Sequence, residues 1–201
     1  MERTETLLVA DLFEADTTAL ASIVEKYGRL VYRLAIQITK NHEDANDVMQ
    51  ETFLKVHESI GTFRQESAFE TWLYRIVVNQ GLNLVKRRDR RREFSISNEA
   101  EFDIRCDLRV HNDYRDTPHA EVEKKELQRW VTQAVDSLPA KHRTVVILHE
   151  FEGLTHPRIA AILNCSEGTV RSRLHYARRK LREMLRPYVD GVNRPRKKER
   201  D

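Results

Sequence analysis

The stretch from Thr155 to Leu181 constrains the fold of this chain more than any other. Apolar residues spaced for packing two helices together flank Asn164, and asparagine tolerates the left-handed backbone that a tight turn between helices requires. Thr155 and Ser166 stand where side-chain oxygens cap helices, and Ala160 is small enough to let the helices approach closely. This combination predicts a helix-turn-helix, whose second helix enters the major groove of DNA.

The second helix of this motif separates its residues by angle. Val170, Leu174 and Ala177 share the face toward the first helix, whereas polar and basic residues occupy the other faces. Arginine can bind guanine edges through two hydrogen bonds, and further basic side chains contact phosphates. The residues expected at DNA are Gly168, Thr169, Arg171, Ser172, Arg173, His175, Arg178 and Arg179. A surface helix with solubilising charges is the alternative, which the agreement of turn, caps, spacing and charge disfavours.

The rest of the chain also predicts helices. In residues 20–38, for example, apolar residues recur at three- and four-residue steps, and no stretch alternates as a strand would. The periodicity fails between about Glu93 and Pro118, where the chain is polar and rich in acids, so this segment is expected to be a flexible linker. We therefore expect an all-α fold with two small helical domains, residues 1–92 and 119–187, a linker over 93–118, and a basic disordered tail over 188–201.

The charge distribution is uneven although the net charge is only +3. Bases cluster over residues 86–92 and from Arg171 onward, whereas acids cluster near the N-terminus and over residues 43–51. This asymmetry indicates two surfaces for a polyanion and a separate surface for another partner. Solvated helix faces are the competing explanation for any single run of charges.

Several classes of function lack their signatures in this sequence. Its eight histidines are scattered, and no pair of acids, nucleophile with a base, or glycine-rich phosphate loop is apparent. Cys106 and Cys165 lack metal-site spacing with His111 or His119 and fit a reducing compartment. No apolar run approaches membrane-spanning length, and the chain begins without the pattern of a signal peptide. We expect no enzyme activity, cofactor, metal or membrane insertion, and a cytoplasmic location.

Several motifs in the second half resemble a known family. Ser137-Leu138-Pro139, Gly153-Leu154-Thr155, Ile159-Ala160 and the run from Gly168 to Leu174 are similar to the fourth conserved region of extracytoplasmic-function (ECF) sigma factors of the sigma-70 family. In that family this domain binds the minus-35 promoter element. The chain departs from the pattern at Arg158, where the family often has an acid. Loss of a capping-box acid there would weaken the first helix slightly.

The first half resembles the same family. The run Asp47-Val48-Met49-Gln50-Glu51-Thr52-Phe53 is similar to the helix with which sigma factors bind the clamp helices of the largest polymerase subunit. From this resemblance we expect core polymerase to contact Asp47, Gln50, Glu51 and Phe53. Directional carboxylate–guanidinium pairs would suit the exposed acids, although solvated charges would look the same in isolation.

The following segment, from Phe63 to the bases at residues 86–88, resembles the minus-10 recognition segment of the family. Holding unstacked bases needs polar pockets and basic side chains along the strand. The residues expected at minus-10 DNA are Arg64, Gln65, Glu66, Ser67, Ala68, Arg75, Asn79, Asn83 and Arg87. Phe69 and Trp72 have the spacing of core residues instead. The family commonly has Asp at the position of Asn83, which leaves the fine base preference open.

Both matches together imply a stress-responsive sigma factor that directs core RNA polymerase to promoter DNA, as duplex and as melted strand. Many members of the family are held inactive by an anti-sigma protein, so such a partner is implied as well. A stand-alone helix-turn-helix regulator is the first alternative, but the N-terminal half has no receiver or ligand-binding pattern. A helical adaptor without DNA binding is the second, and salt-sensitive DNA binding would argue against it.

Overall fold

The computed structural model describes residues 17–60, 63, 68–94 and 118–192. All regular elements in these residues are helical, which confirms the predicted all-α class. They are α2 (Thr17–Thr39), α3 (His42–Ser59), α4 (Phe69–Phe94), α5 (Pro118–Asp136), α6 (Ala140–Val146), the π-helical turn η2 (Ile147–Phe151), α7 (His156–Leu163) and α8 (Glu167–Val192). The sequence also predicts a short amphipathic helix from Thr6 to about Asp16, but that segment, nearly all of the predicted linker and the end of the predicted tail lie outside the described residues.

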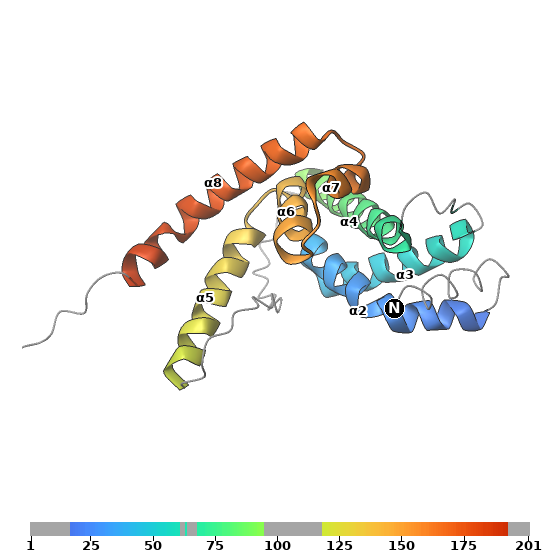
Figure 1. Ribbon diagram of the computed structural model, residues 1–201, viewed down its shortest axis with the longest axis horizontal. Helices are drawn as coiled ribbons and strands as arrows, with labels where there is room; N and C mark the ends of the chain where they lie inside the picture. Colours follow the sequence, from blue (N-terminus) through green and yellow to red (C-terminus); the bar gives the residue numbers. More distant parts are fainter. Residues whose placement is uncertain (1–16, 61–62, 64–67, 95–117, 193–201) are drawn as a thin grey trace, which may run out of the picture.

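Helices α2, α3 and α4 pack on one another and form the N-terminal module (Figure 1). The apolar stripe of α2 is buried as its spacing predicts, with Val31, Leu34 and Ile38 fully inaccessible to solvent. Gly81 allows α4 to approach α2, because a Cβ atom at this position would lie 2.9 Å from Ile38 Cγ2. The two helices could not keep this separation with a larger residue there.

An aromatic cluster supports one end of the N-terminal module. Phe63 meets Phe69 edge-on, with ring centroids 5.9 Å apart, and tilts against Trp72 at 5.2 Å. Tyr27 of α2 joins the cluster through Phe69. Phe69 and Trp72 therefore lie in or against the core, as their spacing predicts. Because Phe63 precedes and Phe69 follows the predicted minus-10 loop, the two ends of that loop are anchored in the same cluster.

Helices α5 to α8 form the C-terminal module, whose core is aliphatic. Leu148, Ile159, Ile162 and Leu174 are almost fully buried there. The proline before it and Gly153 after it predict one continuous helix from about Ala140 to Phe151. The structure interrupts this helix, since its second part is the π-helical turn η2. The wider turn contains an extra residue and so changes the direction of the side chains that follow it.

Helix α8 is longer than the sequence predicts. It continues through Pro187 to Val192, whereas the sequence predicts a disordered tail from residue 188. Proline in a helix removes one backbone donor, which is the reason for expecting an end there. Tyr188, one turn from the end, instead packs against Trp130 of α5 with ring centroids 6.2 Å apart. This contact stabilises the last turns of α8 against α5.

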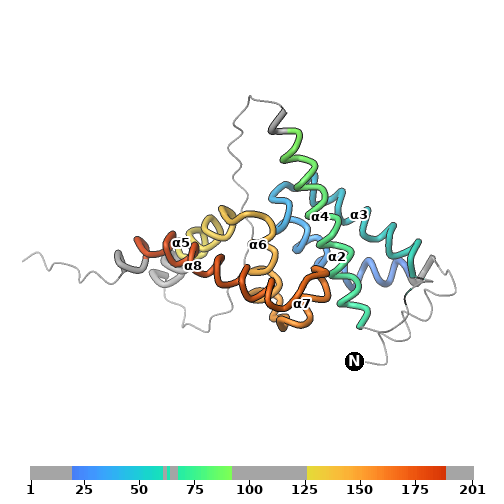
Figure 2. Tube along the Cα trace, turned by 90° about the horizontal axis from the view of Figure 1, so that it is seen from above, coloured from blue at the N-terminus to red at the C-terminus, as the bar shows by residue number. Residues whose placement is uncertain are grey.

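The two modules touch and share one continuous apolar core. α7 lies against α4, and α6 against α2 and α4, whereas α5 and α8 extend together away from the N-terminal module (Figures 1 and 2). The two helices predicted to contact DNA, α4 and α8, are thus connected through the short α7.

Candidate nucleic-acid interface

The helix-turn-helix forms as predicted. Asn164 ends α7 in the left-handed conformation, with φ 47° and ψ 55°, and Cys165 N donates to Ala160 O at 3.0 Å. Ser166 begins α8 by accepting a hydrogen bond from Thr169 N on its side-chain oxygen at 3.1 Å. Val170 and Leu174 are buried against the first helix of the motif. The predicted turn and the second cap are confirmed.

The predicted cap at Thr155 is wrong. Thr155 is the N-cap residue of α7, yet its side chain caps no backbone group. An N-cap oxygen accepts from the second or third residue of the helix, and the second is Pro157, which has no N–H. The sequence thus removes half of the donors that this cap could serve.

The outer face of α8 presents polar side chains to solvent. Gly168, Arg171, Ser172, His175 and Arg179 are exposed, whereas Thr169 and Arg173 are half-buried. The side chain of Arg171 is 66 % exposed and pairs loosely with Glu167 one turn earlier, at 3.3 Å. Such an exposed pair contributes little stability and is easily exchanged for a nucleic-acid partner. This face therefore has the shape and charge of a major-groove helix.

Arg178 is engaged within the protein. Its Nε and Nη2 both donate to Glu150 Oε1, at 3.0 and 2.7 Å. Burial raises the pKa of Glu150, but the hydrogen bond and charge of Arg178 outweigh it, so the net pKa lies below its usual value. Contact between Arg178 and DNA would require this ion pair to rearrange.

A second polar stripe lies on α4. Arg75, Asn79, Asn83 and Arg87 follow one another at four-residue steps, and all four are exposed. Ala68, just before the helix, is exposed too, whereas residues 64–67 lie outside the described part of the chain. The helical members of the predicted minus-10 set are therefore brought together, and the placement of its four preceding loop residues is not described.

A surface hollow of about 310 Å³ lies between α3 and α4. Asp47, Gln50 and Glu51 line it from α3, and Gln80, Leu84 and Arg87 complete it from α4. Phe53 is different: it is buried, 7 % exposed, and packs in the core, so a direct contact with a partner at this residue is not supported. Gln80 and Leu84 were missed, although their spacing of four residues places them on one face of α4 beside Arg87.

Other classes of site are not found in the described segments. Among the described residues, no group of three His, Cys, Asp or Glu side chains is arranged to hold a metal ion. Within the same residues, no helix is both long and apolar enough to cross a bilayer.

Two family models match this chain, one for each module. Residues 23–91 match sigma-70 region 2, and residues 128–181 match sigma-70 region 4. A relative named ECF RNA polymerase sigma-E factor, from Haemophilus influenzae, is 37 % identical over 92 % of this chain and 97 % of its own length. The chain belongs to the ECF group of sigma-70 factors. The predicted family and function are thereby confirmed: the protein is a transcription initiation factor that directs RNA polymerase to promoters.

Further relatives and solved structures agree with this assignment. RNA polymerase sigma-H factor of Pseudomonas aeruginosa is 34 % identical over 90 % of this sigma factor and 94 % of its own length. The sigma factor RpoE of Bartonella quintana, solved in complex with the anti-sigma factor NepR, superposes with a TM-score of 0.61 at 25 % identity, covering 87 % of this chain and 98 % of that one. CnrH, solved with the cytosolic domain of CnrY, shares the fold with a TM-score of 0.62 at 22 % identity, covering 91 % and 97 %.

Proposed function

We propose that this sigma factor uses three separate surfaces, one to bind core RNA polymerase and two to bind promoter DNA. The hollow between α3 and α4 binds core RNA polymerase, the exposed stripe of α4 with the loop before it holds the melted minus-10 strand, and the outer face of α8 binds the minus-35 duplex. The predicted domains, residues 1–92 and 119–187, supply the first two surfaces and the third respectively. The observation that carries the proposal is the arrangement of separate exposed polar faces on α4 and α8.

The minus-35 assignment rests most directly on Arg171, which is exposed on α8 and held only by a weak pair. Replacement of Arg171 by Ala should weaken minus-35 binding by about 1–3 kcal/mol at the contacted base pair and relax the preference there. Transcription from a set of single-base promoter variants, with reconstituted holoenzyme, measures this effect.

Glu183→Ala is the matched control, because Glu183 lies on the same helix, is exposed, and pairs with Lys180 of that helix. This control should leave the order of the promoter variants, ranked by the amount of transcript, unchanged. If Arg171→Ala ranks the variants as the wild type does, the outer face of α8 does not contact the minus-35 bases.

The polymerase assignment rests on the acids of α3. Asp47 and Glu51 are exposed beside the hollow, where a guanidinium group could pair with a carboxylate and be partly shielded from water. Replacing Glu51 by Arg should reduce binding to core polymerase without changing the affinity of the free protein for a minus-35 duplex. A charge change at Glu58, near the end of the same helix and away from the hollow, provides the control.

The function requires no catalytic group, and we propose that the protein acts by assembly in the cytoplasm, as a sigma factor without enzyme activity. An anti-sigma partner is proposed as well, since the sigma factor RpoE of Bartonella quintana, which resembles this chain, was co-crystallised with the anti-sigma factor NepR. Co-purification from the source cells followed by mass spectrometry would test for that partner.

A further inference from the structure

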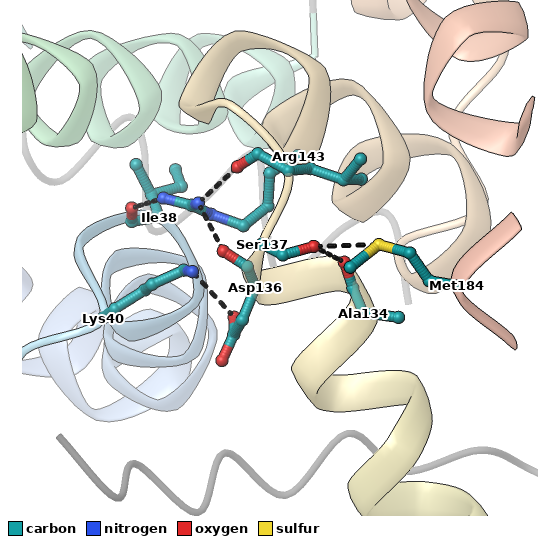
Figure 3. Close-up of polar contacts among 8 residues, drawn as sticks. Ile38, Lys40, Ala134, Asp136, Ser137, Arg143 and Met184 are labelled. Carbon is teal, nitrogen blue, oxygen red and sulfur yellow. Dashed lines mark hydrogen bonds and ion pairs between the residues drawn. The ribbon is translucent and has the colours of Figure 1, made fainter. Parts of the chain in front are cut away.

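The first turn of α6 is anchored by the buried side chain of Arg143. Its Nη2 donates to Ile38 O at 2.7 Å, and its Nη1 donates to Leu138 O at 2.9 Å (Figure 3). The last carbonyl groups of a helix lack partners within the helix and carry partial negative charge, so this guanidinium group satisfies the end of α2 and the chain just after α5. Because Arg143 points inward, its neighbours Lys141 and His142 are held at fixed positions on other sides of α6.

His142 lies against the side of α8 that faces α6. Its ring is tilted on the ring of Tyr176, with centroids 4.4 Å apart, and both side chains are half-buried. The guanidinium carbon of Arg179 lies over the same tyrosine ring, 5.7 Å from its centroid. A cation above an aromatic face is attracted by the electrons of the ring. Since Arg179 is exposed on the outer face of α8, these three side chains form a chain of contacts from α6 to the predicted minus-35 face.

The charges that act on His142 are positive. Burial lowers its pKa most, and the charges of Arg173 and Lys141 lower it further, so the imidazole is neutral near neutral pH in the free protein. Its Nδ1 is buried and has no hydrogen-bond partner in the described structure, so the protein offers no acceptor for a second ring proton there. The charged groups that α4, α5 and the segment after α2 present to α6 act on Arg143 instead; they are Lys40, Arg88, Asp89 and Asp136. The groups beside His142 thus form a positive cluster.

A backbone phosphate of DNA is the ligand that fits this positive cluster. A helix in the major groove has its outer face toward the base edges and its flanks toward the two phosphate backbones. Arg173 and Tyr176 lie on the flank of α8 toward α6, beside Ser172 and Arg179 of the outer face. A phosphate at this flank meets cationic side chains from both helices and places a negative charge beside the imidazole. A nearby negative charge favours the charged form of histidine, so it opposes the effects of burial and of the two cations.

We propose that Lys141, His142 and Arg173 bind one backbone phosphate at the edge of the minus-35 site, and that His142 takes up a proton from solvent when the duplex binds. This inference rests on the proposed function of the outer face of α8 and adds a contact from α6 to it. Tyr176 holds the imidazole ring in place. The complex carries more protons than the separate molecules, so the affinity for the duplex rises as the pH falls. The gain begins near the pKa of His142 in the complex and is complete below its lower pKa in the free protein.

The test measures the affinity of the full chain for a minus-35 duplex between about pH 8 and about pH 6, at constant ionic strength. Every protein carries His175→Asn, because His175 is a second imidazole on the outer face of α8. With His142 present, binding should become about three- to tenfold tighter over this range, since one pKa unit corresponds to a factor of ten. His142→Asn keeps a planar polar side chain and should lose most of this gain. His57→Asn, exposed on α3, is the matched control and should keep the full gain.

Nuclear magnetic resonance measures the proton uptake directly. The chemical shift of the imidazole Cε1 proton of His142, followed against pH with and without the duplex, gives the pKa of this group in each state. The pKa should be higher by about 0.5 to 1 in the complex. An unchanged pKa in the complex, or a gain in affinity that His142→Asn retains, would overturn the inference. Circular dichroism of the variants separates loss of the contact from unfolding.

A salt titration tests the phosphate contact. Lys141→Ala should reduce by about one the slope of log affinity against log salt concentration, whereas Lys26→Ala, exposed on α2, should leave the slope unchanged. A slope that Lys141→Ala does not change contradicts the proposal. If His142→Asn and Lys141→Ala have no effect but Arg171→Ala still alters base preference, the contact from α6 fails and the minus-35 assignment stands. If Arg171→Ala has no effect either, the assignment of the minus-35 face fails as well.

Discussion

The N-terminal and C-terminal modules bury their apolar side chains in different ways. The N-terminal module has three mutually packed helices and an aromatic cluster around Phe69. The C-terminal module has a smaller aliphatic core. It leaves the side chains of Trp130 and Met184 41 % and 40 % exposed to solvent. Among the described residues, the N-terminal module exposes a large apolar side chain to a similar degree only at Leu54, so the C-terminal module leaves more apolar surface unburied and gains more from packing on its neighbour. The comparison suggests that the C-terminal module derives part of its order from the N-terminal one, whereas the reverse is not needed.

The largest expected effect comes from leucine truncation in each module. Leu73 and Leu174 are both buried in helices, and replacing either by Ala should cost about 2–5 kcal/mol of unfolding free energy. Leu174→Ala should abolish minus-35 duplex binding while polymerase binding persists, because the packing that it removes lies within the C-terminal module. Leu73→Ala should impair both. Thermal melting by circular dichroism, with the two binding assays, measures this, and equal, independent effects of the two truncations would refute the proposed dependence.

The next effect is the pH dependence contributed by Lys40. Burial, and secondly the charge of Arg143, lower its pKa to about 8 from an ordinary value of 10.5, with Arg88 adding to them and Asp136 opposing. Between these two pH values the unfolded chain binds a proton that the folded chain lacks. The free energy of unfolding should therefore rise with pH across this window, by up to about 3 kcal/mol.

The control for Lys40 is its replacement by Met, which keeps the apolar stem and removes the titrating group. Urea unfolding at pH 7.5 and at about pH 9.5 should show a smaller increase in this variant than in the parent chain. Equal increases in the two proteins would show that burial and the neighbouring positive charge do not lower the pKa of Lys40.

The smallest expected effect compares two caps within the C-terminal module. Ser166→Ala removes a side-chain acceptor of Thr169 N and should cost about 1 kcal/mol, whereas Thr155→Ala removes no capping hydrogen bond and should cost a few tenths of that. Chemical denaturation resolves the difference. Similar losses for both variants would mean that Thr155 contributes through a contact other than capping.

Local features of this protein were predictable from the sequence, and long-range ones were not. The turn at Asn164, the cap at Ser166 and the stripe of α4 follow from residue type and helical spacing, which operate within a few residues. The failed cap at Thr155 is also local in origin, because Pro157 removes one of the two donors that its side chain could serve. The length of α8 depends on Tyr188 meeting Trp130, a contact between distant segments that no spacing rule contains.

The contacts between the modules illustrate the same limit. The sequence pattern marks Arg158 only as a departure from the acid that the family often has, and it gives Glu152 no special place. Their partners lie roughly 80 to 120 positions away along the chain, with separations of 88 for Arg158 and Glu70 and 119 for Glu152 and Arg33. The π-helical turn that precedes Glu152 has no clear sequence signature, yet it changes the direction of that side chain. Packing of the whole molecule selects these pairs.

Arg143 has one property that the ion pairs do not share. Its acceptors are peptide oxygens of Ile38, Leu138 and Asp136, and every amino acid supplies such an oxygen. Substitution at those three positions therefore leaves the backbone acceptors in place, and the hydrogen bonds from Arg143 are retained. A substitution removes these hydrogen bonds directly only at Arg143, whereas an ion pair between two side chains is removed by a substitution at either residue.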